Sequence, residues 1–231
     1  MTKIKNFFKS ITNSKKKVFA LALSVCVVVL SIASSSIAYF TDTAGYTNTF
    51  TSGKVDITLT EAVALRNETT GHVEIANAEN RRDYNDNAVY GKIFPNQTIA
   101  KDPRITVAAD SEDAYLGATV VISKTGIGTL LNTQDKVKAF ITGLPESQAT
   151  VTINIATDTI TIYVVFTEAR TKNGTAQIFT GLHMLDTWTA TEMSQLNNLQ
   201  VSVNAYAVQK DGFTNALDAL KAGFDTFDSL S

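Results

Sequence analysis

The sequence predicts an all-β fold, an antiparallel β-sandwich with a few short peripheral helices. Short runs rich in β-branched residues recur along the chain, and turns rich in Asn, Asp and Gly separate them. Helical spacing is confined to segments near residues 133–142, 189–196 and 214–227. Strands and helices therefore do not alternate regularly, which argues against a parallel α/β sheet and favours a sandwich.

The first 38 residues have the features of an export signal. The basic cluster Lys15–Lys17 precedes an apolar run from Val18 to Ile32, which is 15 residues long. That is shorter than the roughly 20 apolar residues of a membrane-spanning helix. Ser36 and Ala38 then supply the small side chains that a signal peptidase accepts. We predict cleavage between Ala38 and Tyr39, so the chain meets the membrane only through residues 1–38, before cleavage.

Two alternatives to a cleaved signal follow from the same segment. In a retained anchor, residues 31–38 would lengthen the apolar span. In a lipoprotein, Cys26 would carry the lipid, but this residue lies inside the apolar run behind the bulky Val25. Cys26 is the only cysteine, so residues 39–231 contain no disulfide and no thiol nucleophile. Export without disulfides is typical of bacterial, and particularly Gram-positive, secreted proteins.

Charge and length limit the function of the remaining chain. The full sequence has a net charge of −2, and residues 1–38 hold six of its 20 basic residues and no acidic one. Residues 39–231 therefore carry a net charge of −8, which repels nucleic-acid backbones. Their length suits a single domain with a sizeable core. We predict one secreted domain that does not bind nucleic acid.

Alternating and β-branched residues locate the strands. The clearest pair is a hairpin of residues 151–155 and 159–166, which flank a three-residue turn. Residues 104–108 and 116–123 flank the acidic turn 110–113 and predict a second hairpin-like pair. Further strands are expected at 46–59, with Val55, Ile57 and Leu59 on one face, at 178–185 and at 199–208.

The other segments are predicted to form a loop and helices. Residues 67–90 are polar and without apolar periodicity, which predicts an exposed loop. A helix over 133–142 should end at Gly143, and one or two helical turns are expected over 189–196. The last helix begins behind a Thr214–Asn215 cap. Its polar face is mainly acidic, so we expect it to pack on the domain or a partner rather than on a membrane.

A search for catalytic and metal-binding patterns assigns no residue. His72 and His183 lie in unrelated sequence surroundings, and no His-Glu-x-x-His spacing occurs. Asp83–Asn87 places oxygen ligands at alternate positions as a calcium loop does, but Ala88 stands where such a loop needs Gly. We therefore predict no enzyme, no metal site and no cofactor.

Aromatic residues offer one alternative binding chemistry. Trp188, Tyr163 and Tyr206 would form a sugar-binding face if their rings lay together on the surface. We prefer the interpretation that Trp188 is a buried or edge aromatic residue.

The N-terminal region resembles a known signal class. The sequence Ala38-Tyr39-Phe40-Thr41-Asp42-Thr43, followed by Asn48–Ile57, is similar to the start of proteins processed by the SipW-type signal peptidase. The known clients of that peptidase are the TasA and camelysin (CalY) biofilm-matrix proteins. Two later segments, Lys92–Pro103 and Ala205–Phe213, are also similar to members of this group, although Asn96 replaces a usual Gly.

The resemblance implies a function and a topology. It implies a jelly-roll-like sandwich that is secreted to the extracellular matrix or the cell surface as a structural fibre subunit. Its partners would be further copies of itself, joined head to tail, or a related matrix subunit, with the SipW-type peptidase acting during export. A camelysin-like metalloprotease is a third hypothesis, after a carbohydrate- or surface-binding module, but no residue here can be assigned to such an activity.

The segment freed by cleavage suggests how subunits would join. In residues 39–50, the aromatic residues Tyr39, Phe40, Tyr46 and Phe50 are able to fill apolar pockets of another subunit. The backbone of this segment would then add a strand to an exposed sheet edge. The alternative is that the segment folds back as the first strand of its own domain.

Overall fold

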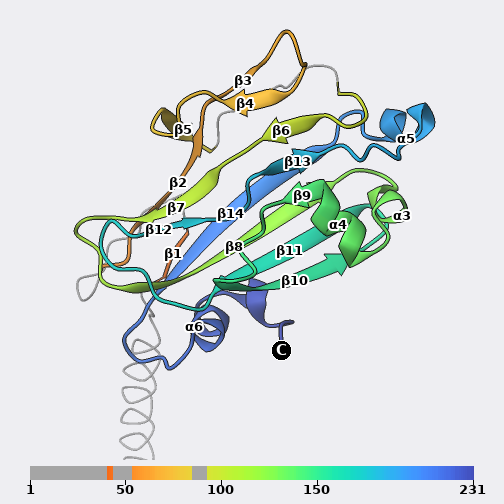
Figure 1. The fold of residues 1–231 in the computed structure, drawn as a ribbon. Helices are drawn as coiled ribbons and strands as arrows, with labels where there is room; N and C mark the ends of the chain where they lie inside the picture. Colours follow the sequence, from red (N-terminus) through yellow and green to blue (C-terminus); the bar gives the residue numbers. More distant parts are fainter. Residues whose placement is uncertain (1–40, 44–53, 85–92) are drawn as a thin grey trace, which may run out of the picture. The chain divides into compact units, whose positions relative to one another are not determined.

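A computed structural model describes residues 41–43, 54–84 and 93–231, which form an all-β sandwich (Figure 1). Its largest sheet is antiparallel and has five strands. In spatial order these are β1 (Thr41–Thr43), β14 (Gln200–Gln209), β8 (Ala114–Ser123), β11 (Thr159–Phe166) and β10 (Ala149–Ile155).

Two smaller sheets form the opposing layer. One has the order β12 (Thr175–Gln177), β7 (Pro103–Val107), β2 (Ile57–Ala62) and β5 (Arg81–Asp83). The other has the order β3 (Ala64–Arg66), β4 (Val73–Ile75), β6 (Thr98–Ala100), β13 (Gly181–His183) and β9 (Ile141–Thr142). All their pairs are antiparallel except β4 and β6, which run parallel and meet at Val73 and Ile99.

The main core fills the space between the layers because β8 presents small and β-branched residues to it. Ala118, Val120 and Ile122 of β8 are completely buried, and Ile105 and Val107 of β7 meet them from the opposing layer. Strand β8 is paired along both edges, by β11 and by β14. A strand with two ladder partners and two covered faces needs mostly apolar residues, as seen here.

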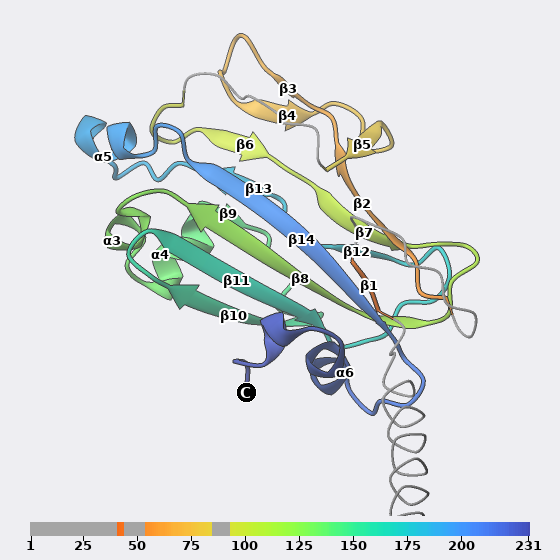
Figure 2. The same ribbon diagram turned by 180° about the vertical axis from the view of Figure 1, so that it is seen from behind.

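A second, smaller core covers the outer face of the five-stranded sheet. Helix α6 (Ala216–Gly223) and the 3₁₀ helix η1 (Asp225–Phe227) pack there through the fully buried Leu220 and Phe227. Both views show α6 beside this sheet (Figures 1 and 2). A Cβ atom on Gly117 of β8 would lie 2.7 Å from Leu220 Cδ1, so the helix needs glycine at that position.

Several sequence predictions are confirmed. The antiparallel sandwich with short helices is observed, and β10 and β11 form the predicted hairpin. The helices α4 (Gln134–Phe140), α5 (Ala190–Gln195) and α6 lie in the predicted segments, with Asn215 as the N-cap of α6. The short helix α3 (Ile127–Leu130) was not predicted.

The predicted pairing of residues 104–108 with 116–123 is wrong. Strand β7 lies in the opposing layer and pairs with β2 and β12, whereas β8 pairs with β11 and β14. The acidic turn between them leads from one layer to the other. Its buried Ser111 is held by the segment just before β2, which lies in the same layer as β7. The Ser111 Oγ accepts the Asp56 N–H at 3.1 Å and donates to Lys54 O at 3.3 Å.

Two other segments differ from the prediction. The described part of the predicted polar loop 67–90 contains the three-residue strands β4 and β5. The strand expected at 178–185 is only the three residues of β13. The predicted strand 46–59 starts outside the described residues; within them β2 begins at Ile57, and Val55 and Ile57 are buried as expected.

Candidate functional site at the edge of strand β14

Along one edge of β14, several backbone groups have no strand partner among the described residues. The Lys210 N–H donates to Asp113 O at 2.8 Å, which continues the β14–β8 ladder beyond the strand end. In an antiparallel ladder, hydrogen-bonded and non-hydrogen-bonded residue pairs alternate. The backbone N–H and C=O groups of the even-numbered residues of β14 therefore form the hydrogen bonds to β8. The N–H and C=O groups of Val201, Val203 and Ala205 therefore point to the opposite edge, as do those of Ala207.

Among the described residues, strand β1 covers one end of this edge. Thr41, Asp42 and Thr43 pair with Val208, Ala207 and Tyr206. No other strand of the described residues pairs with this side of β14. At the far end, the Tyr84 hydroxyl lies 3.5 Å from Val201 O. We call the stretch Gln200–Ala205 on this side the open edge of β14.

The open edge carries no charge that would discourage another strand. Val203 and Ala205 are buried in the main core, whereas Gln200, Ser202 and Asn204 are exposed on the outer face. The whole strand from Gln200 to Gln209 contains no charged residue. Natural edge strands are commonly protected by charges, proline or bulges, and neither of the first two is present on β14.

Most of the predicted site residues lie outside the described residues. These are the predicted cleavage positions Ser36, Ala38 and Tyr39 and the predicted assembly residues Tyr39, Phe40, Tyr46 and Phe50. Within the predicted assembly segment only Thr41–Thr43 is described, and its backbone pairs with β14 of the same chain. Both the cleavage site and the donated strand remain predictions.

No known protein family, characterised protein or solved structure matches this chain. Its function is therefore inferred from the residues of the chain itself and from the resemblance of its N-terminal region. Among the described residues, no helix combines the length and the apolarity needed to cross a membrane. The apolar run from Val18 to Ile32 lies outside those residues.

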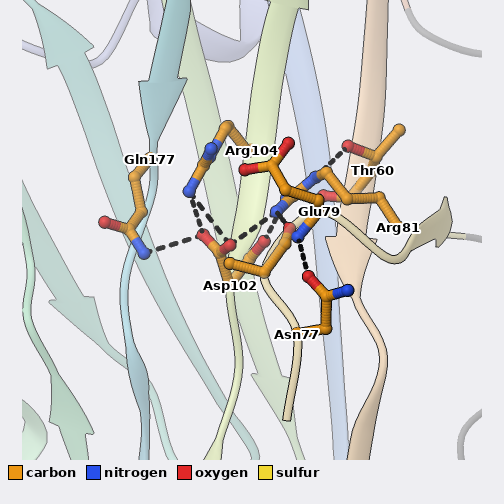
Figure 3. Close-up of polar contacts among 8 residues, drawn as sticks. Thr60, Asn77, Glu79, Arg81, Asp102, Arg104 and Gln177 are labelled. Carbon is orange, nitrogen blue, oxygen red and sulfur yellow. Dashed lines mark hydrogen bonds and ion pairs between the residues drawn. The ribbon is translucent and has the colours of Figure 1, made fainter. Parts of the chain in front are cut away.

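A cluster of charged side chains lies on the opposing layer (Figure 3). The carboxylate of Asp102 is almost fully buried and accepts hydrogen bonds from Arg81 at 2.6 Å, Arg104 at 3.1 Å and Gln177 Nε2 at 2.7 Å. Arg81 also donates to the Thr60 hydroxyl at 2.8 Å. The cluster thus joins β2, β5, β7 and β12 across their whole sheet.

This cluster is structural, since its members satisfy one another. Arg81 also donates to the carbonyl oxygens of Thr60, Asp102 and Ala78. The N–H groups of its guanidinium are thus used in hydrogen bonds within the domain. Beside it, the buried Lys101 ammonium lies 2.8 Å from Glu61 Oε1, at a distance typical of an ion pair although the geometry is not that of a directed hydrogen bond. The described residues contain no group of three His, Cys, Asp or Glu side chains placed to bind a metal.

The two histidines share a neighbour, contrary to the prediction that their surroundings are unrelated. His72 Nδ1 accepts the Thr98 N–H at 2.9 Å, and His183 Nδ1 lies 3.3 Å from the Thr98 hydroxyl. No sequence pattern indicates this arrangement, because β4, β6 and β13 are brought together only by the sheet. The His72 side chain accepts a hydrogen bond from the backbone of β6 and so holds β4 against β6.

Trp188 is buried, which agrees with the prediction of a buried or edge aromatic residue and not with a sugar-binding face. It is 6% exposed and packs against Phe140 in the main core, with ring centroids 5.9 Å apart. Tyr163 and Tyr206 instead contact Phe227 in the second core, on the other side of the five-stranded sheet. The three aromatic rings therefore form no common face for a sugar.

The acidic turn before β8 pairs with a lysine. Lys54 Nζ lies 2.7 Å from Asp110 Oδ2 and 3.2 Å from Asp56 Oδ2. The hydrogen bond to Asp110 is the main cause that raises the pKa of Lys54, and the same bond lowers the pKa of Asp110. Asp110 of this turn thus forms an exposed ion pair with Lys54. The described carboxylates of the turn are not placed to bind a calcium ion together.

Proposed function

We propose that this chain is a secreted structural subunit of extracellular or biofilm-matrix fibres. Removal of residues 1–38 by a SipW-type signal peptidase would free an N-terminal strand beginning at Tyr39. That strand would pair with the β14 edge of the next copy, or of a related matrix subunit, and each subunit would donate one strand and accept one. A contact of this kind joins subunits head to tail and produces filaments.

The observation that carries this proposal is the pairing of β14 in the described part of the chain. Strand β1 comes just after the predicted cleavage site, and its described residues occupy three positions of a ten-residue strand. The remaining positions have outward backbone groups and no described strand partner. A strand from another copy would find both the position that β1 now occupies and the open edge of β14 beside it.

The resemblance of the N-terminal region supports the same assignment. The segment that carries the similarity to the TasA and camelysin group contains β1 itself, at Thr41–Thr43. The net charge of −8 after removal of residues 1–38 suits a soluble subunit outside the cell. Neither the charged cluster around Asp102 nor the two histidines supplies a catalytic alternative, since both sets of side chains bind within the fold.

Replacement of the donor segment tests the proposal. In a chain that starts at Tyr39, residues 39–47 are exchanged for a Gly/Ser sequence of equal length. The variant should remain folded, because both described hydrophobic cores lie in later residues. It should form no filaments by negative-stain electron microscopy under conditions in which the parent chain does.

A control keeps the donor segment and alters a strand of the same sheet that has no free edge. Thr161→Ser in β11 should leave filament formation unchanged, since β11 is paired by β10 and β8 on its two edges. Filaments of normal appearance from the Gly/Ser variant would refute strand donation.

A further inference from the structure

The outer edge of β10 is a second strand edge without a partner among the described residues, at the end of the five-stranded sheet opposite to β1 and β14. Strand β10 is seven residues long and pairs only with β11 among the described residues. The hydrogen bonds Ala156 N–H to Thr159 O and Thr167 N–H to Gln148 O continue this ladder at both ends. Even-numbered residues therefore bind β11, and the backbone groups of Ala149, Val151, Ile153 and Ile155 face outward.

The other terminal strands of the described sheets are much better protected. Strands β3, β5 and β12 have three residues each and β9 has two. Strand β5 in addition consists entirely of charged residues. Shortness and charge are the usual means by which edge strands avoid pairing with another chain. β10 has neither, since its sequence ATVTINI contains no charge, no proline and no glycine.

The residues of β10 are complementary to a second copy of the same strand. If two copies meet antiparallel about a two-fold axis at Thr152, Val151 faces Ile153 of the second copy, and Ala149 faces its Ile155. All four of these residues have their side chains on the core side of the sheet, where Val151 and Ile155 are only half-buried and would become covered. On the outer side Thr152 faces its own copy, and Thr150 faces Asn154. Threonine pairs and β-branched pairs are favourable cross-strand neighbours.

We infer that β10 is a homotypic pairing edge, at which two copies of this chain join antiparallel with Thr152 at the two-fold axis. The match of β10 with its own sequence in this register argues for a second copy, and the absence of charge permits it, since a charged residue near the axis would be repelled by its own copy across the contact. The contact is isologous and closes after two copies. It is independent of strand donation at β14 and, in a fibre, would link neighbouring filaments side by side.

Engineered disulfides test both the edge and its register. Residues 40–231 form one compact unit that contains both described cores and no cysteine, so an introduced cysteine is the only thiol. In the proposed register Thr152 is a non-hydrogen-bonded pair with itself, with Cα atoms about 4.5 Å apart, which suits a disulfide. Thr150 lies four residues out of register with its own copy, at about 14 Å.

The proposal predicts that Thr152→Cys forms a disulfide-linked dimer under mild oxidation at least about tenfold faster than Thr150→Cys. In a chain that carries the Gly/Ser replacement of residues 39–47 and therefore donates no strand, sedimentation velocity should show dimerisation with rising concentration. Thr152→Lys in the same background should remove this dimerisation, because two lysines would meet at the axis. Thr161→Lys, on the same face of the neighbouring strand β11, is the matched control and should dimerise like the parent.

Three results would overturn the proposal. They are a unit that stays monomeric at all concentrations, equal cross-linking of the two cysteine variants, and filaments of the Thr152→Cys variant in which the introduced thiol stays unlinked. The last result would leave the fibre function intact and reject only the β10 contact. Cross-linked dimers of the Thr152→Cys variant, from a chain that forms no filaments, would support the β10 contact and reject the fibre function.

Discussion

Buried and exposed carboxylates have different roles in this protein, although both are paired with basic side chains. Asp102 is 3% exposed and has two arginines and a glutamine as partners. Asp110 is exposed and pairs with Lys54, whose side chain is also largely in solvent. Desolvated charges need their partners, whereas solvent screens exposed pairs.

Asp102→Asn should therefore destabilise the domain strongly. The substitution keeps the shape of the side chain but leaves Arg81 and Arg104 without their counter-ion, at an expected cost of about 3 kcal/mol in the free energy of unfolding. Urea denaturation measures this loss. The matched substitution Asp110→Asn should have no measurable effect. Equal effects of the two variants would contradict the structural role of the cluster.

Glu192 gives a pH-dependent contribution at the start of α5. The Thr189 backbone N–H and then its hydroxyl donate to this carboxylate, and both bonds lower the pKa of Glu192 below its ordinary value of 4.5. A lowered folded-state pKa stabilises the fold above the ordinary value, and the contribution is lost as the pH falls below it. Glu192→Gln should thus be less stable than the parent at pH 7, and the difference should shrink below about pH 4.5. Unfolding at a series of pH values tests this; a difference independent of pH would exclude it.

At the scale of elements, α6 depends on one glycine in the strand beneath it. A methyl group at Gly117 would collide with the buried ends of Leu220 and Phe227, at 2.7 and 2.9 Å from their nearest atoms. The helix approaches β8 this closely because its own side, through Ala216, Ala219 and Leu220, is also made of small and apolar residues.

Gly117→Ala should cost about 1–3 kcal/mol by overpacking, and Leu220→Ala about 3 kcal/mol by leaving a cavity. The double variant should cost less than the sum of the two, since the smaller residue 220 makes room for the added methyl group. Thermal or urea unfolding of all three measures the coupling. Leu217→Ala, which changes a half-buried leucine of the same helix, should show no such coupling with Gly117→Ala. Additive costs at residue 220 would show that the helix lies elsewhere.

The elements that the sequence predicts well are those whose partners are near in the chain. The β10–β11 hairpin follows from two β-branched runs beside a short turn, and the α6 cap from Asn215. The layer of β7 could not be predicted in this way, because it depends on Ser111 binding the backbone of Asp56, 55 residues away. Strands β4 and β5 have too few residues for a periodic pattern, and side chains such as His72 and Arg81 hold them in place.

The candidate site was only half predictable for the same reason. The alternation of residues 199–208 predicts β14 as a strand, and the resemblance of the N-terminal region points to a strand just after the predicted cleavage site. Neither shows that the two meet, or that Gln200–Ala205 has no strand partner on this side among the described residues. That arrangement depends on the spatial order of the five-stranded sheet, which joins strands from both ends of the domain.

For the whole molecule, the five-stranded sheet carries the two proposed contacts at opposite edges. The opposing layer covers one of its faces, and α6 with η1 covers part of the other. Its edges are where backbone hydrogen bonds to other chains can form. Strand donation at β14 would extend a filament, and pairing at β10 would join two filaments.

The most direct test of the fibre assignment compares two chains that differ only at the N terminus. One begins at Tyr39, and the other carries a folded tag joined to Tyr39; both are viewed by negative-stain electron microscopy at equal concentration. We predict filaments from the free N terminus alone, which would make signal-peptide cleavage the trigger of assembly. Monomers from both chains, or filaments from both, would contradict assembly by strand donation.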